Sequence, residues 1–212
     1  MTTSSPPRWA RAARSRWAAV ATPAAEPTHF DPSATTGLPD PVARWLRHAI
    51  EPGTELGAAV LVGMRGHVRI GTWRPFRASQ VISASGFVWA ADARFGPVPV
   101  RGFDRYFDAE GEMRWRLLGA IPVMSARDAD ITRSAAGRLA VEILVAPFGA
   151  LFPNVAWHGI DACHAGAHIE IEARPTSSPS PSTRSDGCSR LHFRAGETRS
   201  ASPTACTPSG SR

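Results

Sequence analysis

The feature that most constrains the fold is the segment from Pro99 to Ser125, where apolar and polar residues alternate on both sides of an acidic turn. The turn reads Asp108-Ala109-Glu110-Gly111, and alternation with a period of two around such a turn is typical of a long antiparallel hairpin. The segment also holds the only tyrosine, Tyr106, and a dense set of charges. We therefore expect the domain to be organised around this hairpin.

The flanking segments predict more strands and two helices. Apolar residues at helical spacing follow Asp40 and Pro41, which suit a helix start, and they predict an amphipathic helix over 41–50. A second helical pattern follows Asp128 or Asp130, with Pro147 ending or kinking that helix. Alternating patterns predict strands over 58–70, 73–81, 87–91, 155–160 and 167–171. The predicted class is α+β: a curved antiparallel sheet, a half-barrel-like meander, with a short N-terminal amphipathic helix and one helix inserted before the last strands.

Composition divides the chain into three parts. Residues 1–37 contain several prolines and predict a disordered leader, although a basic surface-binding helix around Trp9 and Trp17 is an alternative. Residues 38–172 predict a single α+β domain. Residues 173–212 are dominated by serine, proline and threonine and predict a disordered tail.

The tail also fits a shifted reading frame. If the last base of each codon is joined to the first two of the next, the codons from Arg174 onward permit TDVLTLTVDPVGRLL, and those from Phe193 to Arg199 permit PRWGNPE. The first string alternates apolar and polar residues around a turn, as two strands would. All 24 basic residues are arginine and Asn154 is the only asparagine, which is typical of a GC-rich genome. We therefore interpret the tail as the product of a single-base insertion or deletion near codons 172–175.

Three segments resemble an uncharacterised bacterial family, a domain of unknown function. They are LPDPVARWLRHA at 38–49, PVRGFDRYFDAEGEMRWRLLG at 99–119 and TRSAAGRLAVE at 132–142. The resemblance implies a PRWGNP-type motif and a final HPFG near the C-terminus, and here both are permitted only in the shifted frame. The resemblance implies no activity. The strand-rich pattern is similar to curved half-barrels that shelter hydrophobic ligands, which is an analogy of fold.

Charge and composition exclude several classes of function. The formal net charge is +6, but residues 37–172 hold 14 arginines and 14 acidic residues, so the body is neutral and we expect no nucleic-acid binding. No apolar run is long enough for a transmembrane segment, and the N-terminal apolar stretch is too short for a signal peptide, so a cytoplasmic location is expected. Three cysteines are too few for a disulfide framework. The sequence does not indicate an oligomeric state.

The candidate site residues lie in the central segment. Five side chains could line one polar end of a cavity for a ligand: Arg101, Asp104, Tyr106, Arg114 and Trp115. The acids from Asp104 to Glu112 could alternatively act in acid–base catalysis, but the neighbouring arginines balance them and favour cross-strand ion pairs. His158, Asp161, Cys163, His164 and His168 match no zinc spacing, and His158 and His168 could face each other across a hairpin. We predict no catalytic residue, metal or cofactor.

The best hypothesis for function is noncatalytic binding of a hydrophobic small molecule or lipid in the curved sheet. An enzyme that uses the acids of the 104–112 turn is one alternative. A truncated, nonfunctional copy is another, because the loss of two closing strands would leave a sheet edge unpaired.

Overall fold

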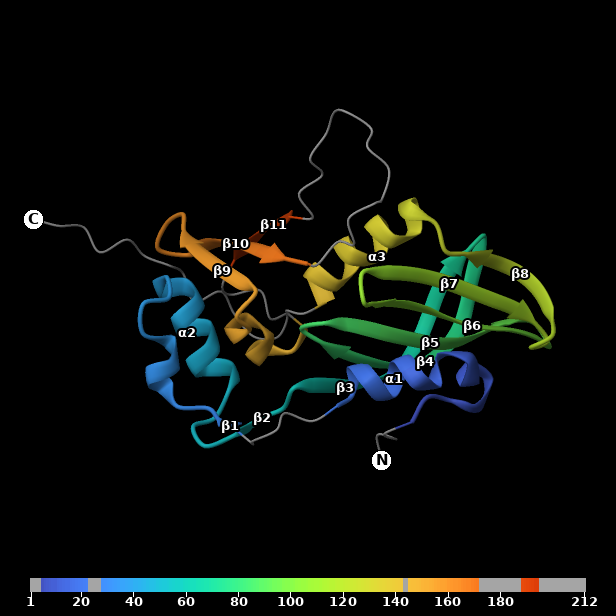
Figure 1. Ribbon diagram of the computed structural model, residues 1–212, viewed down its shortest axis with the longest axis horizontal. Helices are drawn as coiled ribbons and strands as arrows, with labels where there is room; N and C mark the ends of the chain where they lie inside the picture. Colours follow the sequence, from blue (N-terminus) through green and yellow to red (C-terminus); the bar gives the residue numbers. More distant parts are fainter. Residues whose placement is uncertain (1–4, 23–27, 143–144, 172–187, 195–212) are drawn as a thin grey trace, which may run out of the picture.

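The structure is a computed structural model that describes residues 5–22, 28–142, 145–171 and 188–194. Figure 1 shows two bodies: a large curved sheet covered by helices α1 and α3, and a smaller sheet packed beside helix α2. Within the described residues, no helix has the length and apolarity that a membrane crossing requires.

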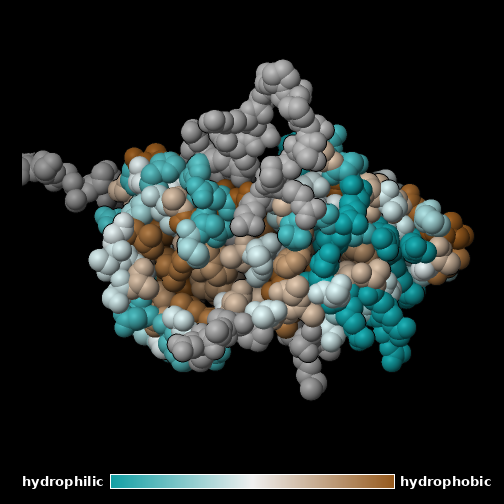
Figure 2. All heavy atoms as spheres, in the orientation of Figure 1, coloured by the Kyte–Doolittle hydropathy of each residue, from teal (hydrophilic) through white to brown (hydrophobic). Residues whose placement is uncertain are grey.

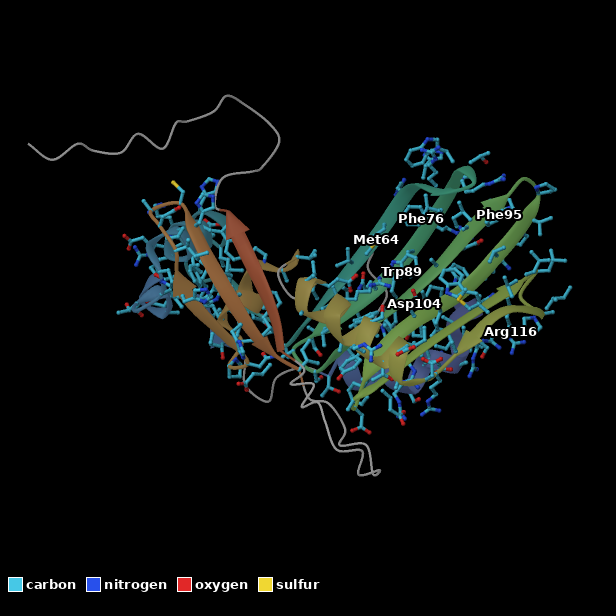
Figure 3. All side chains as sticks on the ribbon, turned by 90° about the horizontal axis from the view of Figure 1, so that it is seen from above. Met64, Phe76, Trp89, Phe95, Asp104 and Arg116 are labelled. Carbon is cyan, nitrogen blue, oxygen red and sulfur yellow. The ribbon has the colours of Figure 1, made fainter. Side chains whose placement is uncertain are left out.

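The large sheet has six strands in the order β3-β4-β5-β6-β7-β8, and each strand is antiparallel to its neighbours. The strands are β3 (Ala59–Ile70), β4 (Thr72–Ser83), β5 (Gly86–Phe95), β6 (Val98–Phe107), β7 (Glu110–Leu117) and β8 (Ile121–Ala126). This meander confirms the predicted α+β class and the curved antiparallel sheet, which is not closed (Figures 1 and 3).

The central hairpin is formed by β6 and β7, as the sequence predicts. Phe107 lies opposite Glu110, so the loop consists of Asp108 and Ala109 alone. Both residues have positive φ, 53° and 54°, which is the backbone of a two-residue turn that matches the twist of the strands. Residues 121–125, which the sequence predicts in the second arm of the hairpin, lie in the separate strand β8.

The small sheet has the order β11-β10-β9, with β9 (Val155–Gly159) and β10 (His164–Glu170) as predicted. The third strand, β11 (Cys188–Arg194), pairs antiparallel with β10 along its whole length. Residues 188–194 lie in the segment for which the sequence predicts a disordered tail, and here they form a backbone ladder with the edge of β10. The rest of the predicted tail lies outside the described residues.

The predicted helices are present. Helix α2 (Asp40–Ala49) has Pro39 at its N-cap position and Pro41 in its first turn. Helix α3 (Ala129–Glu142) is preceded by Asp128, whose Oδ1 accepts a hydrogen bond from the Ile131 amide at 2.9 Å. The remaining elements are short: β1 (Thr28–His29) pairs with β2 (Glu55–Leu56), and the 3-10 helices η2 (Pro32–Thr35) and η4 (Pro147–Leu151) adjoin α2.

Residues 5–22 lie in the segment for which the sequence predicts a disordered leader, and the structure gives them helices. The segment forms the 3-10 helix η1 (Arg8–Ala13) and helix α1 (Arg14–Val20), which pack on the large sheet. Ala10, Ala13, Trp17 and Val20 are buried there, because their spacing of three and four residues places them on one helical face. Burial of that apolar face outweighs the flanking prolines.

Three apolar clusters hold these parts together. The first joins α3 and β10 to one end of the large sheet around Phe87, Tyr106 and Leu139. The second joins η1 and α1 to the other face of that sheet around Val81, Val88 and Phe103. The third packs α2 against η4 and β10 through a separate set of side chains: Phe30, Val42, Leu46, Ile50, Ala150 and Ala165. The large sheet thus carries helices on both faces, with α3 on the inner side of its curve.

Candidate functional site

The strand registers assign every side chain of the large sheet to one of two faces. Val62, Gln80, Trp89, Asp104 and Met113 are successive partners across five strands, so they lie on one face in a row. Met64, Ala78, Ala91, Gly102, Trp115 and Met124 form the next row on the same face. Figure 3 shows the labelled members Met64, Trp89 and Asp104 on the inner side of the curved sheet, which we call the concave face.

The five predicted ligand-binding residues do not share a face. Asp104, Tyr106 and Trp115 lie on the concave face, whereas Arg101 and Arg114 lie on the opposite, convex face. The reason is the period of two along a strand, which sends residues 101 and 104 in opposite directions. The structure therefore brings three of the five together and separates the two arginines from them.

Asp104 is the centre of a buried polar network on the concave face. Its Oδ1 accepts a hydrogen bond from Nε1 of Trp115 at 2.9 Å, and its Oδ2 lies 3.1 Å from NH1 of Arg138 on α3. Nε of Arg138 also donates to Oε1 of Glu142 at 2.7 Å, and the Gln80 amide donates to the other oxygen of Glu142. The network ties the middle of the sheet to the side of α3 that faces it.

Burial raises the pKa of Asp104 above its usual value of 3.8, because the carboxylate loses contact with water. The hydrogen bond from Trp115 and the positive charge of Arg138 act in the opposite direction and compensate only part of that effect. The nearby carboxylate of Glu142 adds to the increase. Burial therefore disfavours the charged form of Asp104, and a carboxyl group perturbed in this way is often found in functional sites.

Aromatic rings surround this network. Trp89 and Trp115 lie with their ring centroids 5.7 Å apart and their planes tilted by 54°. The guanidinium of Arg138 lies over Phe87 at 4.7 Å and over Trp89 at 4.9 Å from the ring centroids. Such cation–π contacts stabilise a charged group that has lost part of its hydration.

Beyond the network the concave face becomes apolar. Its middle strands carry small residues, Ala78, Ala91, Ala93 and Gly102, all of which are buried. Larger, half-exposed side chains stand around them: Met64, Phe76, Phe95, Val100, Trp115 and Leu117. We call these two sets the floor and the walls of the apolar trough, a name that rests on the strand registers. Figure 3 labels Met64, Phe76 and Phe95 of the walls.

Gly102 is required at this position of the floor. A Cβ added there would lie 2.6 Å from the Trp115 ring and 2.3 Å from the Arg114 carbonyl oxygen. The absence of a side chain at Gly102 therefore allows Trp115 to lie close over β6, where its indole reaches Asp104.

Tyr106 lies in the packed core of the domain. Its exposed fraction is 2%, and it packs with Leu139 and Ile169 in the cluster that attaches α3 and β10. It also lines a cavity of about 370 Å³ between the turn at Asp108 and Ala109 and the strand end at Glu170 and Ile171.

Arg101 and Arg114 take part in two ion-pair groups on the convex face. Asp92 Oδ2 lies 3.3 Å from Nε of Arg101 and 3.2 Å from NH2 of Arg77. Glu112 contacts Arg105 at 2.7 Å and Arg114 at 2.6 Å. These pairs agree with the expectation that cross-strand ion pairs balance the charges of the central hairpin.

The acids of the central segment do not form a catalytic pair in this structure. Asp104 lies on the concave face and Glu112 on the convex face, while Glu110 pairs with Arg127 at the edge near α3. A general acid and a general base must reach the same substrate, and two carboxylates on opposite faces of one sheet do not.

His158 and His168, which could have faced each other across the hairpin, are not direct partners in the structure. His158 lies opposite Gly166, and His168 lies opposite Ala156, so the two do not face each other. Nδ1 of His164 lies 2.8 Å from Oδ1 of Asp161. Within the described residues, no group of three or more potential ligands is placed to hold a metal ion.

Sequence reasoning missed Gln80, Arg138 and Glu142, which complete the network around Asp104. The contacts span 34 residues for Asp104 and Arg138 and 62 residues for Gln80 and Glu142. The walls were accessible in principle, because Met64 and Phe76 alternate with polar or exposed neighbours. Assigning the walls to one face requires the register of the five strands β3 to β7, which one sequence does not provide.

Comparison with known proteins places the chain in a family. A family model with the description "Family of unknown function (DUF6544)" matches residues 28–178. Neither the curated proteins nor the solved structures gave a match. The matched range includes α2, the whole large sheet, α3 and β10, and it leaves out η1 and α1. The chain therefore belongs to DUF6544, a family of unknown function.

Proposed function

We propose that the domain binds an apolar small molecule or a lipid acyl chain in the apolar trough, without catalysing a reaction. The observation that supports this most is the distribution of side-chain size on the concave face, with small residues along the middle strands and large ones around them. Ligand sites are concave and mostly apolar, with few polar groups. Because the floor has no bulky side chains, a change of rotamer in the wall side chains would leave space for a ligand above it.

The polar network supports the same proposal. The carboxylate oxygens of Asp104 are bound by Trp115 and Arg138, and Arg138 is also bound by Glu142. Groups that already satisfy one another offer little to a charged ligand, so the network closes one end of the trough and holds Trp115 in place. We expect a ligand that is apolar over most of its length.

Extraction of lipids from the purified protein, followed by mass spectrometry, tests the proposal directly. Binding of the neutral apolar dye N-phenyl-1-naphthylamine, followed by its fluorescence, gives a second readout. We expect a co-purified apolar compound and dye fluorescence that this compound displaces. If no compound is extracted and the dye gives no signal with folded protein, the proposal is wrong.

A matched pair of variants locates the site. Met64→Gln combined with Phe76→Gln places polar groups on two walls, and should weaken dye binding roughly tenfold because buried apolar area is lost. Arg65→Gln introduces the same residue at the next position of β3 but on the convex face, and should leave dye binding unchanged. Equal losses in the two proteins would show that the dye does not bind in the trough.

We infer further that the natural gene carries a different reading frame after about codon 172. The support is the change in composition at that point, the strand-like pattern of the shifted frame, and the family match, which ends at residue 178. Resequencing codons 165–180 from the source genome tests this inference. One base gained or lost would show that functional work needs the repaired chain, and an unchanged frame would favour a divergent or nonfunctional copy.

A further inference from the structure

The convex face of the large sheet carries a row of arginines that no function described above uses. Arg65, Arg77, Asp92, Arg101 and Arg116 are successive partners across strands β3 to β7. Four cations and one anion therefore stand side by side. Like charges directly opposite each other on neighbouring strands are destabilising, so the pairs Arg65–Arg77 and Arg101–Arg116 call for a compensating negative charge.

The N-terminal segment converts one end of this row into a cavity. Arg8 and Trp9 of η1 meet Arg101, Arg116 and Gly119 around a volume of about 570 Å³. Among the described residues, this lining includes three guanidinium groups and no carboxylate. Figure 2, drawn from the side of α1, shows hydrophilic residues gathered on the half of the molecule that holds the large sheet.

Other residues hold Arg101 and Arg116, the two arginines of the sheet that line the cavity. The Asp92 carboxylate, whose side chain is only 1% exposed, holds Arg101 through its Nε. The ring of Trp9 lies 5.6 Å from the Arg101 guanidinium and 5.3 Å from that of Arg77. NH1 of Arg116 donates to the carbonyl oxygen of Ala120 at 3.1 Å. Each of these contacts uses one part of a guanidinium group and leaves other N–H donors for a ligand.

The neutral charge count of residues 37–172 hides this concentration of positive charge. The acids of the central segment lie elsewhere: Asp104 and Glu142 on the concave side, Glu110 near α3, and Glu112 against Arg105 and Arg114. Asp92 is the only acid in the arginine row, and it has two partners already. The cavity therefore lies in a locally positive potential, which attracts anions.

We propose that this cavity binds a phosphate monoester group. Guanidinium groups match the oxygens of a phosphate with paired hydrogen bonds, and a doubly charged phosphate balances three cations better than a single carboxylate does. The group could belong to a soluble metabolite or to a lipid headgroup, and the chemistry of recognition is the same. This site is on the opposite face from the apolar trough and does not depend on it.

Titration of the full-length protein with inorganic phosphate at constant ionic strength, with chloride as the balancing ion, tests the site. We expect saturable heat in calorimetry and a rise in Tm that grows with the logarithm of phosphate concentration. The variant Arg8→Gln combined with Arg116→Gln should bind phosphate at least roughly tenfold more weakly, because charge-assisted hydrogen bonds are lost. Arg65→Gln is the control, since it removes a cation from the same row but does not line the cavity.

Two outcomes would overturn the proposal. One is a wild-type protein that responds to phosphate no more than to chloride. The other is a loss of phosphate affinity in Arg65→Gln as large as in the double variant, which would indicate general charge screening. A cooperative thermal melt and an unchanged circular dichroism spectrum serve as the check on folding of each variant, and neither depends on the trough.

The source of the phosphate is settled by two further probes. Glycerol 3-phosphate is a soluble monoester, and phosphatidylcholine vesicles with phosphatidic acid as a minor component present the same group at a surface. Binding to either one that the Arg8 and Arg116 variant loses supports the site, and the tighter of the two identifies the source. Binding to neither contradicts the proposal.

Discussion

The indole Nε1 of Trp115 donates a hydrogen bond to Oδ1 of Asp104 across the β6–β7 hairpin, and the two atoms lie 2.9 Å apart. The bond gives the carboxylate a donor that does not exchange with water. It also fixes the Trp115 ring against Gly102, where it separates the polar network from the apolar trough. This side-chain pair thus links the polar network to the packing of Trp115 on Gly102.

The first prediction concerns the pH dependence of stability. The folded-state pKa of Asp104 is raised, chiefly by burial, above the usual 3.8. Below pH 3.8 the carboxyl is protonated in both states, and as the pH rises through the folded-state pKa the folded protein keeps its proton longer than the unfolded chain. The contribution of Asp104 to the free energy of unfolding therefore falls as the pH rises.

Asp104→Asn removes this titration and keeps an acceptor for Trp115. The difference in free energy of unfolding, wild type minus Asp104→Asn, should decrease as the pH rises above 3.8, measured by urea denaturation. Asp104→Ala should be less stable than Asp104→Asn by about 1–3 kcal/mol, because Trp115 Nε1 then lacks an acceptor. A pH-independent difference would show that burial does not control this carboxyl.

The second prediction concerns Gly102. Gly102→Ala should destabilise the protein by about 1–3 kcal/mol, because the new methyl group would overlap the Trp115 ring and the Arg114 carbonyl. Gly63→Ala is the control, since it lies in a strand of the same sheet with no atom within 4 Å of the added Cβ. The expected result is a loss of Tm in the first variant only, and equal effects would contradict the close approach of Trp115.

The third prediction concerns the N-terminal helix. Trp17 is 1% exposed and packs on the sheet, so Trp17→Ala should lower the free energy of unfolding by about 3–5 kcal/mol. Trp17→Phe should cost much less, because Nε1 of Trp17 is buried without a hydrogen-bond partner and its removal relieves an unsatisfied donor. Chemical denaturation of both variants tests this, and an unchanged Trp17→Ala protein would indicate that the segment does not pack on the sheet.

The local patterns of the chain were enough to predict most of the strands and helices. The hairpin around Asp108 and the helix after Asp40 follow from periodicity and end signals within about ten residues. The packing of the N-terminal segment was missed because four prolines and four arginines outweighed the helical spacing of Trp17 and Val20. Composition describes the average environment of a segment, whereas packing depends on which side chains share a face.

The candidate site was predictable only in part, for a geometric reason. Asp104, Tyr106 and Trp115 were grouped with Arg101 and Arg114 by closeness in sequence, although alternation along β6 and β7 could have divided them. Arg138 could not have been placed beside Asp104, because their contact depends on the docking of α3 across a gap of 34 residues. The arginine row could not be predicted for the same reason, since it takes one residue from each of the five strands β3 to β7.

The last prediction concerns the buried ion pair of Arg105 and Glu112. The side chains are 5% and 9% exposed, and NH2 of Arg105 lies 2.7 Å from Oε2 of Glu112. Glu112→Gln would leave the charge of Arg105 without a counterion, and we expect a loss of about 3–5 kcal/mol in urea denaturation.

The double replacement Arg105→Met with Glu112→Leu should recover most of that loss, because two apolar side chains of similar volume need no hydration in the interior. The adjacent Val88 and Phe103 provide apolar surroundings in which they can pack. A double variant less stable than Glu112→Gln would mean that Arg105 stabilises the fold through contacts other than Glu112. We expect the double variant to be more stable than Glu112→Gln, because the double replacement also removes NH1 of Arg105, a buried donor without a hydrogen-bond partner.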